Sequence, residues 1–270
     1  MAINWVDRVP TKPGRIKITP EDGSSAWYGV MERADEPSVV GTPINAANLN
    51  SMQKNAGLDA NITVYVAVSG SDRTGTGSST APYQTITKAL SAIPKQLNGF
   101  TATINIGAGT YAENVSVSGF SNGMLYFYSN NGNKVEISRL EVSNTAHFQA
   151  SAGFTLQVNN GIVVTNDAFV YIESAITCGN VARGIQVAKG SRAIFTNTVE
   201  INSTSEFAIF VTNANLVITT ISGTNNNTGV RVTSGGVFSF AVNNLVATVI
   251  YSTTSGGRIY SGAQTNAPNY

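Results

Sequence analysis

Charged residues are scarce in this 270-residue chain. They make up 11% of the sequence, and the formal net charge is +1, whereas an ordinary soluble domain is about 25% charged. A chain with so little excess of either sign creates no strong field to attract nucleic acid or an anionic membrane. The composition therefore predicts neither a nucleic-acid partner nor insertion into a membrane, and Asn, Ser, Thr and Gly must keep the surface hydrophilic.

Cysteine and histidine are almost absent. Cys178 is the single cysteine and His147 the single histidine, which excludes an intramolecular disulfide and leaves no Cys/His cluster for zinc. We therefore expect no metal and no other cofactor. No stretch approaches 18 apolar residues, and the N-terminus lacks the apolar segment of a secretory signal. These two absences favour a soluble protein that is not exported through a cleaved leader.

What the chain does have is a repeat of paired apolar residues. The pairs are Leu140/Val142, Ile162/Val164, Ile185/Val187, Ile209/Val211, Val230/Val232 and, at the end, Ile250 alone. The first members of successive pairs lie 22, 23, 24, 21 and 20 residues apart. A period of this length without a helix inside it is typical of a β-solenoid, in which each coil buries its apolar edge only against its neighbours. We call the surface that this series follows the first face.

Two further series define a second and a third face. The second face follows Phe148, Val170, Ile194, Leu216, Phe238 and Ile259, and the third follows Leu156, Ile176, Ile201, Ile221 and Leu245. Three strands in each coil fit an all-β fold, a right-handed parallel β-helix of triangular section with about seven coils over residues 101–262. Residues 263–270 form a C-terminal tail.

The segment before the coils predicts an entry region, residues 58–100. It contains a strand at 61–70, a loop, and an apolar stripe of Ile86, Leu90, Ile93 and Leu97 at helical spacing within residues 82–97. We expect this amphipathic helix to cap the N-terminal end of the solenoid, whose open coil would expose unpaired backbone. No comparable helix follows the last coil, so either a partner covers that end or the last coil is distorted.

Residues 1–57 differ in amino-acid composition from the rest of the chain. They are richer in charge and proline, hold both tryptophans, and end in a stretch that favours a short helix stopping at Gly57. A segment of this size cannot carry a substantial core alone. We therefore expect residues 1–57 to dock on another protein or on a sister subunit.

Two stretches carry a resemblance to phage proteins. NWVDRVPTKPGRIKITPEDG, together with GTPINAANLN, resembles the N-terminal segment of tail-fibre and baseplate-associated proteins of phages and prophages that infect Gram-positive bacteria. YVAVSGSDRTGTGSSTAPYQTITKALSAIP resembles the entry segment of pectate-lyase-like β-helices found in phage tail spikes. The resemblance implies a homotrimer, attachment of residues 1–57 to a phage tail or baseplate protein, and a location in the virion after synthesis in the bacterial host cytoplasm.

The expected function is then that of a phage tail-fibre or tail-tip protein that recognises a bacterial surface glycan without cleaving it. One alternative is a tail-spike polysaccharide depolymerase with its active site between subunits, and another is a purely structural baseplate or fibre component. Glycoside hydrolysis usually needs two carboxylates about 5–9.5 Å apart. Glu141, Glu173 and Glu200 each stand alone on their face, so we assign no catalytic residue. The entry loop is a further candidate site for a cation, and Asp72 is its single acidic residue.

Two sets of outward residues are candidate binding groups. On the first face, Phe210, Arg231 and Tyr251 project among small neighbours, which suits a trimer interface. On and beside the second face, aromatic and imidazole rings offer stacking surfaces for sugars. The glycan-binding candidates are Tyr126, Tyr128, His147, Tyr171, Phe195 and Tyr260.

Overall fold

The computed structural model describes residues 15–18, 27–30 and 57–261, with residue 180 left out. The chain divides into two compact units, Met1–Ala56 and Gly57–Tyr270. In the first unit, β1 (Arg15–Ile18) and β2 (Trp27–Val30) pair as antiparallel strands. The helix predicted before Gly57 and the tail over residues 263–270 lie outside the described residues.

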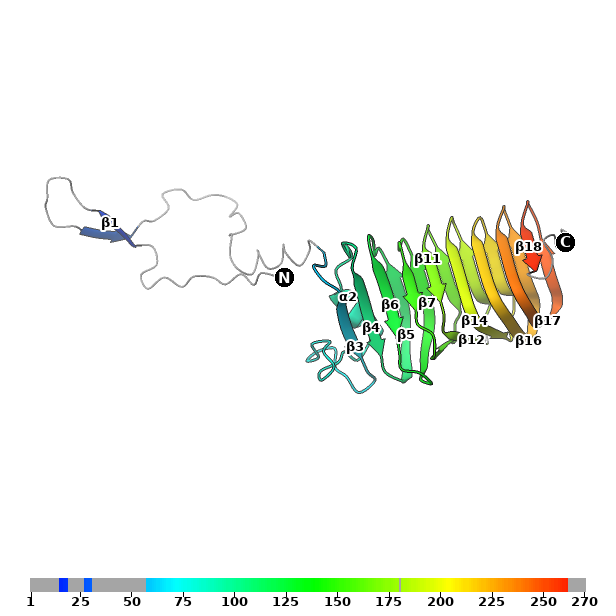
Figure 1. Ribbon diagram of the computed structural model, residues 1–270, viewed down its shortest axis with the longest axis horizontal. Helices are drawn as coiled ribbons and strands as arrows, with labels where there is room; N and C mark the ends of the chain where they lie inside the picture. The colour runs from blue at the N-terminus through cyan, green and yellow to red at the C-terminus, as the bar shows by residue number, and fades with distance from the viewer. Residues whose placement is uncertain (1–14, 19–26, 31–56, 180, 262–270) are drawn as a thin grey trace. The chain divides into compact units, whose positions relative to one another are not determined.

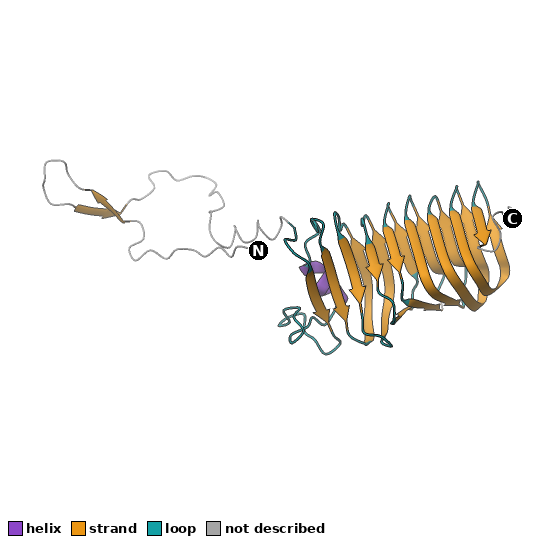
Figure 2. Cartoon of the chain, viewed as in Figure 1, coloured by secondary structure: helices purple, strands orange, loops and turns teal. Residues whose placement is uncertain are grey.

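The second unit is a parallel β-solenoid of about seven turns (Figures 1 and 2). Its strands pair in parallel with strands one coil away, so that β10, for example, lies between β7 and β13. The strands are β3 (Ile62–Val66), β4 (Thr101–Ile106), β5 (Gly109–Ser118), β6 (Met124–Tyr128), β7 (Lys134–Ser143), β8 (Phe148–Ala150), β9 (Thr155–Val158), β10 (Ile162–Thr165), β11 (Phe169–Ile172), β12 (Ala175–Gly179), β13 (Arg183–Ala188), β14 (Arg192–Asn202), β15 (Phe207–Thr212), β16 (Asn215–Thr233), β17 (Val237–Thr253) and β18 (Arg258–Ser261).

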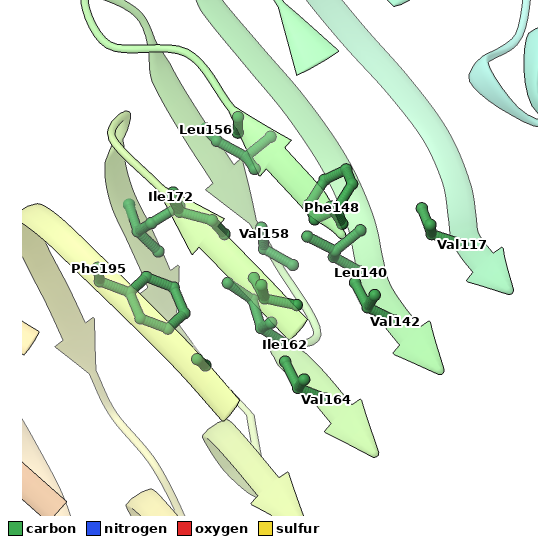
Figure 3. Close-up of a cluster of buried hydrophobic side chains, with 14 of the residues drawn as sticks. Val117, Leu140, Val142, Phe148, Leu156, Val158, Ile162, Val164, Ile172 and Phe195 are labelled. Carbon is green, nitrogen blue, oxygen red and sulfur yellow. The ribbon is translucent and has the colours of Figure 1, made fainter. Parts of the chain in front are cut away.

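Strict alternation of side chains builds the core. Along β4, for example, every second residue is buried and those between are half-buried, because successive residues of a strand point to opposite sides of the sheet. On the first face the predicted columns are confirmed: Leu140, Ile162, Ile185, Ile209 and Val230 are paired in register and fully buried. Figure 3 shows members of this face, including Val142 and Val164, packed among the apolar side chains of neighbouring strands.

On the second face the predicted register is wrong at one coil. Val170 and Leu216 pair with Ala193, not with Ile194. Phe195 pairs with Ile172 and Ile218 and is 1% exposed. The core accepts the small Ala193 at this coil because the large Phe195 ring fills the position beside it. Phe195 is therefore a core residue, and its prediction as an outward glycan-binding residue is wrong.

The third face departs from its predicted column because β14 and β16 are irregular where they turn a corner. Their register shifts between Phe195 and Thr198, so Val199 takes the column predicted for Ile201 and pairs with Ile176 and Ile221. A bulge adds residues to one strand without adding partners on the other. Ile201 is also buried, but it lies in the next inward column, opposite Cys178.

A second shift corrects one candidate interface residue. The pairing of β16 with β17 is irregular between Gly223 and Asn226, and Tyr251 then lies opposite Val230. Tyr251 therefore occupies an inward column of the first face, where it packs against the core. Its prediction as an outward interface residue is wrong, and Ser252 takes that place opposite Arg231.

The helix predicted over residues 82–97 forms only over seven residues, α2 (Ile86–Ala92). It ends because Ile93 has extended backbone, with φ −92° and ψ 128°, as a residue before proline favours. Its buried residues, Ile86, Ala89 and Leu90, belong to the solenoid core. Closure of the N-terminal end by this helix stays a prediction.

Two carboxylates hold the start of α2. Asp72 accepts hydrogen bonds from the Gln84 and Thr85 N–H groups and from the Thr85 hydroxyl. Partial burial would raise the pKa of Asp72, but these bonds outweigh that effect and lower it. Glu113 accepts in the same way from the Ile86 and Thr87 N–H groups. Asp72 thus serves the helix terminus, which explains an acid in this loop without a cation.

Candidate functional site

Outward side chains of β6, β8 and β11 gather into one patch on the second face. Tyr126, Gln149 and Tyr171 are paired in register on consecutive coils, so they form one outward column. Adjacent strands in a sheet lie about 4.8 Å apart, which puts Tyr126 and Tyr171 roughly 10 Å from each other along the rod. The members of what we call the aromatic patch are Tyr126, Tyr128, His147, Gln149, Phe169, Tyr171 and Glu173.

Polar groups lie between the rings of the aromatic patch. The Gln149 side-chain amide donates to Glu173 through Nε2 and Oε2 at 3.1 Å. Burial raises the pKa of the Tyr126 hydroxyl; the neighbouring Ser151 side chain offsets part of this effect, and the nearby Glu173 and Tyr128 add to the rise. Tyr126 therefore stays a neutral hydrogen-bond donor at neutral pH. The patch thus combines a phenol donor, a carboxylate acceptor and an amide that offers both functions.

A second row of rings borders this column. The rings of His147 and Phe169 have centroids 5.1 Å apart and are tilted by 50°, and the Arg192 guanidinium lies 5.8 Å from the Phe169 centroid. Burial lowers the pKa of His147, so its imidazole is neutral at neutral pH and one ring nitrogen can accept a hydrogen bond. Three consecutive coils, those of β6, β8 and β11, therefore carry aromatic or imidazole rings beside polar groups.

The arrangement suits a ligand with both apolar faces and hydroxyl groups. Aromatic rings offer apolar faces, and a few placed polar groups fix the orientation of what stacks on them. A sugar ring has both properties. Three members, Gln149, Phe169 and Glu173, were missed as binding residues from the sequence. A lone Gln or Glu on a strand gives no signal until its neighbours on adjacent coils are known.

Tyr260 lies apart from the aromatic patch. It belongs to the same outward column but follows Ile194, Val217 and Ser239, so it lies four coils beyond Tyr171. There it lines an open groove of about 340 Å³ with Val217, Ile218, Phe240 and their neighbours. The predicted glycan-binding residues therefore divide into the patch near the middle of the rod, the buried Phe195, and Tyr260 at its C-terminal end.

The first face carries a cluster of cations and rings. Phe207 and Phe210 are stacked with centroids 5.4 Å apart. The Arg183 guanidinium lies 5.1 Å from the Phe210 centroid, and that of Arg231 lies 5.2 Å from the Phe207 centroid. Arg183 also pairs with Glu206 at 2.8 Å. The structure thus brings together Phe210 and Arg231, as neighbours in one outward column, and adds Arg183 and Phe207, which the sequence did not single out.

The single cysteine is part of the core. Cys178 is fully buried, and burial raises the pKa of its thiol to about 12, so it stays protonated. Within the described ranges, no three His, Cys, Asp or Glu side chains come together as a metal site would require. Nor does any helix of those ranges have the length and apolar character to span a membrane.

A match to a known protein family covers most of the entry region and the first two strands after it. Residues 68–120 match the family described as "Protein of unknown function (DUF1565)". The matched span runs from the loop before α2 to just beyond β5, and it includes both carboxylates that hold α2, Asp72 and Glu113. No curated protein and no solved structure matches the chain. The family match and the parallel β-solenoid together fit a pectate-lyase-like β-helix.

Proposed function

We propose that this protein is a phage tail-fibre or tail-tip component that binds a bacterial surface glycan through the aromatic patch, without cleaving it. One observation carries the proposal. Tyr126, Gln149 and Tyr171 form a single outward column on consecutive coils, and Gln149 is hydrogen-bonded to Glu173 beside them. Rings repeated along the rod, two coils apart in this column, suit an extended polymer better than a small molecule. The phage context rests on the resemblance of residues 1–57 and of the entry region.

Binding without cleavage is proposed because of the composition of the patch. Glu173 is its single carboxylate, whereas glycoside hydrolysis usually takes a pair. Glu173 is also hydrogen-bonded to Gln149, which holds it as an acceptor for a ligand hydroxyl. A binding role therefore uses every member of the patch.

Replacement of Tyr171 by alanine should weaken glycan binding about tenfold or more, since each 1.4 kcal/mol of binding free energy is a factor of ten. Tyr126→Ala should act in the same direction. The measurement is pull-down of the purified full chain by host cell-wall and capsular glycans, with release of new reducing ends scored in the same samples. Tyr260→Ala is the matched control, because it removes an outward tyrosine of the same column away from the patch.

The outcomes separate the candidate functions. Unchanged binding by both Tyr126→Ala and Tyr171→Ala would overturn the glycan-binding patch. New reducing ends would favour the polysaccharide depolymerase with an active site between subunits. A wild-type chain that binds no host glycan would favour the purely structural baseplate or fibre component.

We propose further that the chain is a homotrimer whose subunits meet through the first face, and that residues 1–57 attach it to a tail or baseplate protein of the virion. The cluster of Phe207, Phe210, Arg183 and Arg231 supports this interface, because aromatic residues and arginine are enriched where subunits meet. No described acidic residue forms an ion pair with Arg231, which leaves its charge available to a neighbouring chain.

Light scattering on the purified chain should give about three times the chain mass of 28.3 kDa. Phe210→Asp should shift that mass toward the single chain, because it removes the ring that packs on Phe207 and Arg183 and puts a hydrated carboxylate in its place on the proposed interface. Thr177→Asp, an outward residue of the third face, should leave the mass unchanged. A wild-type monomer, or a Phe210→Asp variant as trimeric as wild type, would contradict the interface.

A further inference from the structure

The rings of the aromatic patch are arranged at two distinct spacings. The three strands that carry them, β6, β8 and β11, follow one another along the rod (Figure 1). Along the column, Tyr126 and Tyr171 are two strand spacings apart, about 10 Å, with Gln149 between them. Along a strand, outward neighbours such as Tyr126 and Tyr128 are two residues apart, about 7 Å. A ligand that stacks on two of these tyrosines must match one of the two distances.

An extended β-1,4-linked glycan matches the longer distance. In chains of glucose or N-acetylglucosamine the β-1,4 linkages are equatorial, which keeps the chain straight. Each sugar ring is turned over relative to the ring before it, so every second ring presents the same face. Two rings of such a chain span nearly two strand spacings, which is the distance from Tyr126 to Tyr171. Chains with α-1,4 or β-1,3 linkages curve, so their rings do not repeat at this distance along a straight column.

The polar groups of the patch suit the ring between the two stacked ones. Gln149 lies between the tyrosines in the column, and its Nε2 donates to Glu173 Oε2 at 3.1 Å. The Gln149 carbonyl oxygen and the Glu173 carboxylate are acceptors for sugar hydroxyl groups. Glu173 and Arg192 give the neighbourhood one charge of each sign. The balance of charge favours an uncharged glycan over a polyanion.

The length of the site follows from the ends of the column. Two coils before Tyr126 the column holds Thr63, and two coils beyond Tyr171 it holds Val217. Neither side chain offers an aromatic face to a further sugar ring. The column therefore has two stacking positions, and three consecutive sugar rings fill it.

We propose that the ligand of the aromatic patch is an uncharged β-1,4-linked glycan that lies along the rod. Alternate sugar rings stack on Tyr126 and Tyr171, and the ring between them is hydrogen-bonded by Gln149 and Glu173. This inference rests on the proposed function, and it adds the linkage, the direction and the register of the bound chain. Aromatic faces supply most of the contact, and the polar pair fixes the orientation.

Oligosaccharides that share one sugar and differ in linkage test this proposal on the purified full chain. The probes are the β-1,4-linked di-, tri- and tetrasaccharides of glucose and of N-acetylglucosamine, titrated by calorimetry. The α-1,4-linked and β-1,3-linked glucose oligomers are the controls. In at least one sugar, the β-1,4-linked trisaccharide should bind about tenfold or more tighter than the disaccharide, and the tetrasaccharide should add little. A tenfold gain corresponds to about 1.4 kcal/mol for the second stacked ring.

Tyr126→Ala tests the register. It should remove the gain from disaccharide to trisaccharide, because one stacking ring remains, while the disaccharide still binds at Tyr171 and Gln149. Tyr260→Ala is the matched control, since it removes a tyrosine of the same column four coils beyond Tyr171, and it should keep the gain. General damage to the fold would weaken both oligosaccharides alike, so the ratio of their affinities reports the register.

The outcomes separate this inference from the proposed function. If host glycans are captured and Tyr171→Ala abolishes the capture, but β-1,4-linked trisaccharides bind no tighter than α-1,4-linked ones, the patch binds another kind of glycan and the inference is wrong. A preference for the β-1,4 linkage without a gain at the trisaccharide contradicts the stacking on alternate coils. A wild-type chain that binds neither host glycans nor any oligosaccharide overturns the inference and the proposed function together.

Discussion

Phe195→Ala should lower the free energy of unfolding by about 3–5 kcal/mol, the range for truncation of a buried phenylalanine. The ring is 1% exposed and lies in the inward column between Ile172 and Ile218. Its removal leaves a cavity inside the solenoid, because strands paired on both sides cannot collapse into it without breaking their register. Equilibrium unfolding in urea, followed by circular dichroism, measures the loss.

Ile194→Ala is the matched control on the same strand. Ile194 is half-buried on the outward column, between Tyr171 and Val217, so its truncation should lower the free energy of unfolding by less than about 1 kcal/mol. The two variants remove apolar groups from adjacent residues of β14, and only the direction of the side chain differs. If Ile194→Ala proved the more damaging change, Phe195 would point outward, and its prediction as a glycan-binding residue would stand.

Gly223→Ala should destabilise the protein by roughly 4 kcal/mol, from about 1–3 kcal/mol of backbone strain and about 1–3 kcal/mol of overpacking. Gly223 has φ +147°, and a Cβ there would lie within 1.7 Å of the Ile201 carbonyl oxygen. That atom belongs to the backbone of the neighbouring coil, so the clash can be relieved only by moving a strand. Thermal unfolding and soluble yield measure the effect.

Gly235→Ala separates strain from overpacking. Gly235 also has a positive φ, +73°, but nothing lies within 4 Å of the position a Cβ would take. Its replacement should therefore lower the free energy of unfolding by about 1–2 kcal/mol, the strain of a left-handed residue alone. Equal losses for Gly223→Ala and Gly235→Ala would show that β14 and β16 do not approach as closely at Gly223 as the structure has it.

The first face was predictable because each of its coils has two aliphatic residues at alternate positions of the strand. One phase of the alternation places both of them inside. The residue that precedes each of Leu140, Ile162, Ile185 and Ile209 is charged or small. On the second face, Ala193, Ile194 and Phe195 are all apolar, so both phases of the alternation are acceptable. The sequence favours Ile194 as the inward residue, and packing against Ile172 and Ile218 reverses the choice.

The candidate site was predictable only in part. Tyr126 and Tyr171 were identified as outward rings, but their place in one column with Gln149 depends on the pairing of β6, β8 and β11. Glu173 joins them through a hydrogen bond between coils. Contacts between coils join residues more than 20 positions apart, and no local pattern specifies which of them meet.

The sequence by itself determined the repeat, the three faces and the scarcity of charge, because hydrophobic periodicity reports directly on which side of each strand is buried. Only the tertiary structure decided the register at the irregular corners, the burial of Phe195 and Tyr251, and the grouping of the aromatic patch. It also decided that β18 pairs with the second-face part of β17, Val237–Phe240. These features depend on which residues face one another across coils, and that pairing arises only when the strands stack.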